Sequence, residues 1–161
     1  MKIIASFFFL LLFSVNTNIE EIRKLYVKAY DSEVNSKEFA KKLESISSDN
    51  DLVLVAYKGA SMAMVSKYEK KAGQKIKAFK EGAKLIESSI ASQPENIELR
   101  MIRLSVQESV PKIVKYHKNI TEDKSFVLEN YTTQSATLRE YLKNFILQSK
   151  SFSKEEKKSV N

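Results

Sequence analysis

The chain has 161 residues, enough for one domain with a substantial core, and 27 Lys and Arg against 20 Asp and Glu give it a net charge of +7. It has only three Gly and two Pro, a composition that favours helices over a turn-rich all-β fold. Because it has no Cys, disulfides, thiolate catalysis and Cys-ligated metal sites are excluded.

The N-terminal stretch, MKIIASFFFLLLFSVNTN, places one Lys before an apolar run from Ile3 to Val15. A run of this length is typical of a secretory signal peptide and is short for a membrane span, which needs about 20 residues. We therefore expect residues 1–18 to be a signal peptide and the protein to be exported to the periplasm. No Ala-x-Ala cleavage site follows the run. An anchor in the inner membrane through residues 3–15, or a buried first helix, is the alternative.

The lysines, 23 of the 27 basic residues, are interleaved with acids along the chain, and no run of five basic residues occurs. This pattern is typical of solvated helix faces and argues against nucleic-acid binding. Binding of the scattered lysines to an anionic surface is the alternative interpretation.

In chain order, residues Ile19 to Tyr30 form the first amphipathic pattern, and Ser36 is predicted to cap a second helix that runs to Ser48. Leu52 to Tyr68 is apolar on nearly all sides and is predicted to be a buried central helix. One face of it carries only small residues, which would let a neighbouring helix approach closely: Ala56, Gly59, Ala60 and Ala63. A membrane span is the alternative, but the segment is short and Lys58 lies in its middle.

Ile76 to Ser92 is strongly amphipathic, and Pro94 separates it from a helix at Ile97 to Val110. Asn119 and Glu122 match a capping box that opens a further helix. Apolar residues from Leu138 to Ile146 mark the last helix, and residues 150–161 are predicted to be a polar, disordered tail. No strand pattern occurs. We therefore expect an all-α domain at residues 19–149, with six to eight helices in antiparallel pairs.

The segment FKEGAKLIESSIASQPEN, residues 79–96, resembles the second helix of a tetratricopeptide repeat. Gly82, Ile86, Ser89, Ile90 and Pro94 occupy the motif positions, although Ser and Ile stand where Ala and Leu are usual, and no 34-residue period recurs. Residues 52–128 are similar to a family of small exported Bacteroidetes proteins that have no assigned activity. These resemblances imply a tetratricopeptide-like α-α superhelix and a bacterial context, and they imply no catalytic residue.

The helix IELRMIRLSVQESV, residues 97–110, has two apolar faces with Arg100, Arg103 and Gln107 between them. A buried arginine must be paired, and the nearby acids are Glu98, Glu108, Glu122 and Asp123. We favour ion pairs that hold the turn at residues 119–124 against this helix. A solvated stripe, or a groove that binds a carboxylate, are the alternatives.

Motifs for catalysis are absent. His117 is the only histidine, so two-histidine metal sites are impossible, and no Gly-x-Ser-x-Gly or phosphate-binding loop occurs. His117 with Glu122 and Asp123 is the one combination that could hold a divalent ion, and a surface histidine explains it more simply. We therefore expect no catalytic residue, no metal and no cofactor.

The resulting expectation is a non-enzymatic protein-interaction module in the cell envelope, whose partner is an unknown protein that binds along the helix at residues 95–110 and its neighbours. Nucleic acid is not an expected partner, and contact with the membrane is expected only if the N-terminal segment is not cleaved. The alternative is an enzyme, or a protein that binds a small carboxylate or anion, with its site at Arg100 and Arg103.

Overall fold

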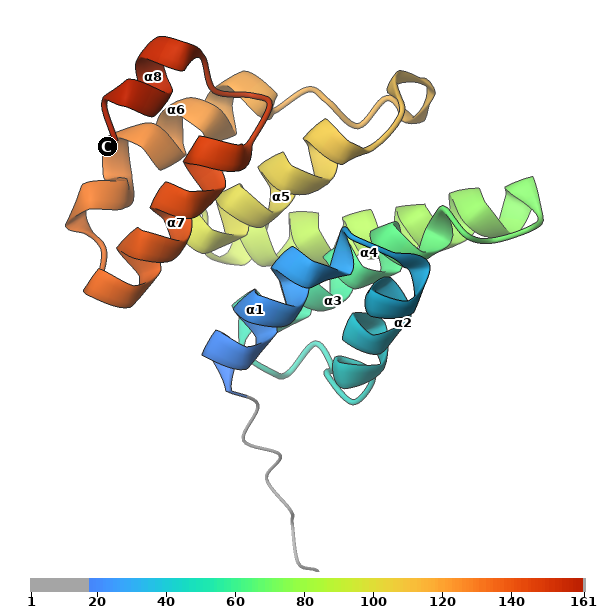
Figure 1. The fold of residues 1–161 in the computed structure, drawn as a ribbon. Coiled ribbons are helices and arrows are strands. Elements are labelled where there is room, and N and C mark those ends of the chain that lie inside the picture. The colour runs from blue at the N-terminus through green and yellow to red at the C-terminus, as the bar shows by residue number, and fades with distance from the viewer. Residues whose placement is uncertain (1–17, 161) are drawn as a thin grey trace, which may run out of the picture.

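The computed structural model describes residues 18–160, which fold into eight α-helices and two short 3-10 turns and contain no strand (Figure 1). This confirms the prediction of an all-α fold with six to eight helices in pairs. The elements are α1 (Ile19–Ala29), α2 (Glu33–Lys42), α3 (Leu52–Ser66), α4 (Ala72–Ser92), α5 (Ile97–Ser109), η1 (Lys112–Val114), α6 (Ile120–Asn130), η2 (Tyr131–Thr133), α7 (Ala136–Gln148) and α8 (Lys154–Lys158).

Helices α3 and α4 form the central pair, and their backbones touch where two glycines meet. A β-carbon on Gly59 would lie 2.5 Å from the carbonyl oxygen of Gly82, and one on Gly82 would collide with the carbonyl of Gly59. This confirms the predicted close approach at the small-residue face of α3. Helix α4 begins at Ala72, four residues before the predicted start, and residues 72–77 are all exposed.

Helix α5 packs against α3, α4 and α6, so both of its apolar faces are buried. The Asn96 side chain accepts hydrogen bonds from the backbone N–H groups of Glu98 and Leu99 and so fixes where the helix begins. Leu99, Ile102 and Leu104 have no exposed surface. The prediction that this helix lies between others is confirmed.

Helices α1 and α2 cover the start of α3 through aromatic packing. The ring of Tyr26 lies 5.0 Å from that of Tyr57 and 5.6 Å from that of Phe39. The predicted cap at Ser36 is wrong, because Ser32 caps α2 at the backbone N–H of Asn35. Ser36 lies inside the helix, buried, and its hydroxyl donates to the carbonyl of Ala29.

The C-terminal residues are part of the fold as far as they are described, so the prediction of a disordered tail is wrong for residues 150–160. The Phe152 side chain is only 5% exposed, and its ring lies 6.2 Å from that of Phe145. Ser153 and Glu156 form a capping box at the start of α8, and Glu156 pairs with Lys124 of α6 at 2.9 Å. The helical domain therefore continues past residue 149.

Among the helices between residues 18 and 160, none combines the length and the apolar character needed to cross a membrane. The predicted signal peptide lies almost wholly at residues 1–17, outside the described residues.

Candidate functional site

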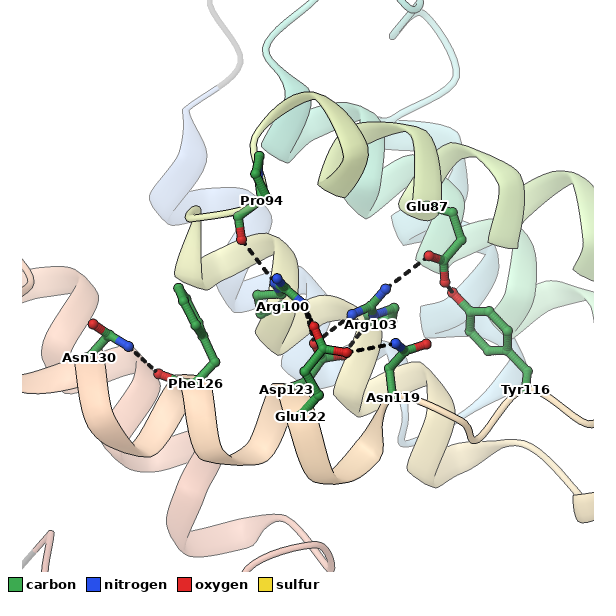
Figure 2. A network of polar contacts seen from close by, with 10 residues as sticks. All are labelled: Glu87, Pro94, Arg100, Arg103, Tyr116, Asn119, Glu122, Asp123, Phe126 and Asn130. Atoms are coloured by element: carbon green, nitrogen blue, oxygen red, sulfur yellow. Dashed lines mark hydrogen bonds and ion pairs between the residues drawn. The ribbon is translucent and has the colours of Figure 1, made fainter.

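Arg103 of α5 is held by two acids from two other helices (Figure 2). Its Nε and Nη2 donate to the two carboxylate oxygens of Asp123, each at 2.7 Å, and its Nη1 donates to Glu87 of α4 at 2.9 Å. Asp123 is fully buried and Arg103 nearly so. Burial alone would lower the pKa of Arg103, but the hydrogen bonds and charges of Asp123 and Glu87 raise it above its ordinary value, so the guanidinium stays charged.

Arg100 lies one turn earlier on α5 and binds the start of α6 (Figure 2). Its Nη1 donates to Glu122 at 2.5 Å and to Asp123 at 3.1 Å, and its Nε donates to the carbonyl of Pro94 at 2.9 Å. Its guanidinium also lies 5.2 Å from the centre of the Phe126 ring. The predicted partners Glu122 and Asp123 are therefore confirmed, and the turn at residues 119–124 is held against α5.

We call Glu87, Arg100, Arg103, Glu122 and Asp123 the arginine seam. All three nitrogen positions of the Arg103 guanidinium donate within it, and Glu87 also accepts a hydrogen bond from the hydroxyl of Tyr116 at 2.7 Å. A carboxylate ligand would have to displace Asp123 from a fully buried position. The geometry is therefore that of an internal ion-pair network.

The predicted capping box at Asn119 does not form. The Asn119 side chain makes no capping bond to the helix backbone, and its amide nitrogen donates instead to Glu122 Oε2 at 2.9 Å. That bond, together with the bond from Arg100, lowers the pKa of Glu122 below its ordinary value of 4.5. Asn119 thus supports the seam through the side chain of Glu122.

A second buried ion pair joins α1 to α5. Arg23 donates through Nε and Nη2 to the two carboxylate oxygens of Glu98, at 2.8 and 2.6 Å, and the Tyr57 hydroxyl donates to Glu98 at 2.7 Å. Glu98 was predicted to pair with an arginine of its own helix, which is wrong. Because 75 residues separate Arg23 from Glu98, the sequence could not identify the two as partners. It indicated only that Arg23 lies between Ile22 and Tyr26, which both face the core.

The two remaining predicted residues, Glu108 and Gln107, form no hydrogen bond or ion pair with the arginine seam. Glu108 accepts hydrogen bonds from the hydroxyls of Ser149 at 2.6 Å and Ser151 at 2.9 Å, and so binds the connection between α7 and α8. Gln107 is fully buried, and both polar atoms of its amide lack a partner among the described residues.

A groove of about 380 Å³ lies between α1 and α7, with α5 as its floor. We call it the α1–α7 groove. Val27 and Tyr30, at its edge, are 50% and 37% exposed. The lining residues are Tyr26, Val27, Tyr30, Asp31, Ser105, Glu108, Ser109, Tyr141, Asn144, Phe145, Gln148, Ser149 and Lys150.

The aromatic walls of this groove carry hydroxyl groups that bond within the protein. The Tyr26 hydroxyl bonds to that of Ser105 and lies 3.2 Å from that of Tyr30, while the hydroxyls of Tyr57 and Tyr141 lie 3.1 Å apart. Burial raises the pKa of Tyr26 and of Tyr141 above the ordinary value of 10.0. The phenols are therefore neutral at physiological pH, and the charged residues of the lining are Asp31, Glu108 and Lys150.

A second hollow, of about 590 Å³, adjoins residue 18, where the described part of the chain begins. Its charged walls include Arg23 and Glu98, which pair with each other. It is lined by Asn18, Ile19, Arg23, Asp51, Val53, Leu54 and Glu98.

His117 does not join Glu122 and Asp123 as a metal ligand. Its Nε2 lies 3.1 Å from the carbonyl oxygen of Val110, and both acids are bound to arginine. In the part of the chain that the structure describes, no three His, Cys, Asp or Glu residues gather closely enough to hold a metal ion.

Comparison with known proteins adds no relative to this picture: no family model, curated protein or solved structure matches the chain.

Proposed function

We propose that the protein is an exported, non-enzymatic interaction module whose α1–α7 groove binds a segment of a partner protein in the cell envelope. The observation that carries this proposal is the groove itself, a concave and largely apolar surface that includes the aromatic rings of Tyr141 and Phe145, with Val27 and Tyr30 exposed at its edge. Aromatic surface of this kind is enriched where proteins bind one another. The apolar run at residues 3–15 supports export.

The chemistry of the groove favours a segment that inserts an apolar or aromatic side chain. Val27 and Tyr30 of α1 stand opposite Tyr141 and Phe145 of α7, so an inserted side chain would be covered on both sides. Along the rim, the exposed amides of Asn144 and Gln148 offer donors and acceptors to a partner backbone. The floor belongs to α5, the helix along which the sequence predicts the partner to lie.

The alternative site at Arg100 and Arg103 has less support. Arg103 is buried against Asp123 and Glu87, and Arg100 binds Glu122, Asp123 and the carbonyl of Pro94. A small carboxylate would compete with acids that are already held in place by the fold.

Site-specific photo-crosslinking in the native host tests the proposal. A photoreactive residue at Val27 should give a discrete protein adduct, and one at Asn144, on the facing helix, should give the same adduct. Val34 of α2 is the matched control, because it is also a valine, is 73% exposed and does not line the groove.

The result expected for a groove partner is an adduct from positions 27 and 144 that is absent from position 34. Val27→Asp should also weaken the adduct formed from position 144 while leaving the melting temperature unchanged, because Val27 is half exposed. Equal adducts from position 34, or no adduct from either groove position, would overturn the proposal. If a small molecule copurifies with the wild type and not with Val27→Asp, the groove binds a low-molecular-weight ligand and not a protein, which would also overturn the proposal.

A further inference from the structure

The start of α4 and the connection between α5 and α6 are far apart in the sequence, and the fold brings them together. The ring of Phe79 lies 5.5 Å from that of Tyr116, and the Tyr116 hydroxyl donates to Glu87 of α4. Ile76 is one helical turn before Phe79, and Ile113 is three residues before Tyr116. Both segments project from the same side of the molecule, the right-hand side in Figure 1.

We call residues 67–80 together with residues 110–118 the lysine end. These two stretches hold nine lysines and one glutamate, an excess of eight positive charges, while the whole chain has a net charge of +7. The rest of the chain is therefore close to neutral. The lysines of this end are all exposed: Lys67, Lys70, Lys71, Lys75, Lys77, Lys80, Lys112, Lys115 and Lys118.

These lysines are largely free to meet an external anion. Within residues 18–160, only Lys77 of the nine approaches an acid, Glu81, at 4.0 Å on the exposed face of α4. The sequence predicts lysines scattered over solvated faces, and the structure instead gathers a third or more of them at one end. A cluster of like charges on one surface attracts polyanions from the surrounding solution.

Exposed aliphatic side chains lie among these charges. Ile113 is 87% exposed, Ile76 is 55% exposed, and Val114 is exposed beside Ile113. Lys112 and Lys115 flank the apolar pair on the projecting turn η1. An apolar tip between lysines matches a phospholipid surface, where the aliphatic groups enter the headgroup layer and the ammonium groups meet lipid phosphates.

The composition of the lysine end favours a lipid surface over a nucleic acid. It holds no arginine, the residue best suited to grip phosphates in two places. Arg23, Arg100 and Arg103 are bound internally, and Arg139 lies on α7. Its most exposed apolar groups are aliphatic, whereas single-stranded nucleic acids are bound by stacking on aromatic rings. The ring of Tyr116 is already packed against Phe79.

We infer that the lysine end docks onto an anionic phospholipid surface, with Ile113 and Val114 entering the headgroup layer. This contact is separate from any anchoring by residues 1–17 and from the α1–α7 groove, which no residue of the lysine end lines. The two surfaces would let the protein hold a partner while it lies on the membrane.

A fluorescent probe at residue 114 tests this inference in the full chain. The chain has no cysteine, so Val114→Cys gives a single attachment point for an environment-sensitive dye. Val34→Cys, an exposed position on α2 that is not one of the residues of the lysine end, is the matched control. Each labelled protein is titrated with vesicles of neutral phosphatidylcholine and with vesicles that contain about one-third phosphatidylglycerol. Residues 1–17 are the same in both labelled proteins, so any affinity of these residues for the membrane contributes equally to the two titrations.

The probe at residue 114 should shift to the blue with the anionic vesicles and not with the neutral ones, and the probe at residue 34 should not shift. A lysine beside an anionic membrane contributes about fivefold to affinity, so Lys112→Gln/Lys115→Gln should weaken the titration at least about tenfold. Ile113→Asp should abolish the blue shift.

Three results would overturn the inference. They are no shift at residue 114, an equal shift with neutral vesicles, and an equal shift at residue 34. Tighter binding to a single-stranded oligonucleotide than to the anionic vesicles, measured with the same probe, would also overturn it and would assign the lysine end to nucleic acid.

Discussion

Arg23, Arg100 and Arg103, three of the four arginines, each bind carboxylates that come from other parts of the fold. Two of these arginines lie on α5, and the third, on α1, binds Glu98 of α5. In a buried pair the desolvation of both charges is offset only while both partners are present. The loss of a single partner is therefore expected to cost far more stability than the loss of an exposed ion pair.

Glu98→Gln removes the charge that Arg23 of α1 requires. Glu98 is buried and accepts hydrogen bonds from both the Arg23 guanidinium and the Tyr57 hydroxyl, so this variant should lose about 3–5 kcal/mol of stability. Chemical denaturation with urea measures the change. Glu95→Gln, three residues earlier and exposed, is the control and should change stability by less than about 0.5 kcal/mol. Equal stability of the two variants would show that the pair contributes nothing.

Acid should weaken the arginine seam through Glu122. Because the hydrogen bond from Asn119 and the bond from Arg100 lower its pKa below 4.5, Glu122 stabilises the fold fully above that pH, and the contribution is lost as the pH falls through the lowered value. Melting temperatures measured from about pH 6 to about pH 3 should therefore fall more steeply for the wild type than for Glu122→Gln. Glu129→Gln, an exposed residue of the same helix, should follow the wild type. Parallel curves for wild type and Glu122→Gln would contradict this role.

At this scale the sequence predicted the two acids on the helix after α5, and it missed both Glu87, which lies 16 residues before Arg103, and the pair between Arg23 and Glu98. Glu122 and Asp123 follow Arg100 by 22 and 23 residues and lie in the first turn of the next α-helix, so their place in the chain identified them. Glu98 was assigned to the wrong arginine, because helical periodicity shows which way a side chain faces and not which distant helix it meets. Glu108 was predicted as an arginine partner and instead binds two serines near the C-terminus.

Among the helical elements, the α3–α4 pair depends on the absence of two side chains. Gly59 and Gly82 each face the other's carbonyl oxygen, so a methyl group at either position would force the helices apart. The small-residue face of α3 and the inward position of Gly82 were both readable from the sequence. Their direct contact was not, because the crossing point depends on how the two helices are rotated and offset.

Gly59→Ala should destabilise the protein by about 1–3 kcal/mol, because overpacking at the helix crossing outweighs the better helix propensity of alanine. Gly73→Ala is the matched control on α4, since a β-carbon there would meet only open space. That variant should be neutral or more stable by up to about 1 kcal/mol. The melting temperatures of both variants give the comparison. Equal melting temperatures for Gly59→Ala and Gly73→Ala would show that α3 and α4 do not meet at Gly59.

The C-terminal element shows how one apolar residue can order a polar segment. Phe152 packs on Phe145, and the Ser153–Glu156 capping box then begins α8. The polar composition of residues 150–161 predicted disorder, because a single aromatic side chain that docks on the core produces no periodic hydrophobic pattern in the sequence. The hydroxyls of Ser149 and Ser151, which bind Glu108 of α5, add to this docking.

Phe152→Ala should lower stability by about 3–5 kcal/mol, because a nearly buried ring would be lost. It should also speed amide hydrogen exchange in residues 150–160 beyond the global effect. Lys150→Ala, an exposed neighbour, is the control. Unchanged exchange in this segment after Phe152→Ala would contradict the docking of the C-terminal residues.

In the whole molecule, the stabilising polar contacts and the exposed candidate surfaces lie in different places. The arginine seam lies between α4, α5 and α6, with Arg103 and Asp123 buried and Glu122 exposed at its rim, while the α1–α7 groove and the lysine end are open. The all-α class and helix order followed from the sequence, since long amphipathic patterns are its strongest signal. The α1–α7 groove and the lysine end could not be predicted from the sequence, because each is formed by segments that only the tertiary packing brings together.

The central claim is that the arginines of α5 hold the fold together and do not form a ligand site. The melting temperature of Arg103→Met, measured on purified protein beside Arg139→Met, tests it most directly. Arg103→Met leaves the fully buried Asp123 without its main partner, so the melting temperature should fall by about 10 °C. Arg139 is exposed, and its loss should change the melting temperature by no more than about 2 °C. An unchanged melting temperature in Arg103→Met would contradict the claim and return Arg103 to the role of a ligand-binding residue.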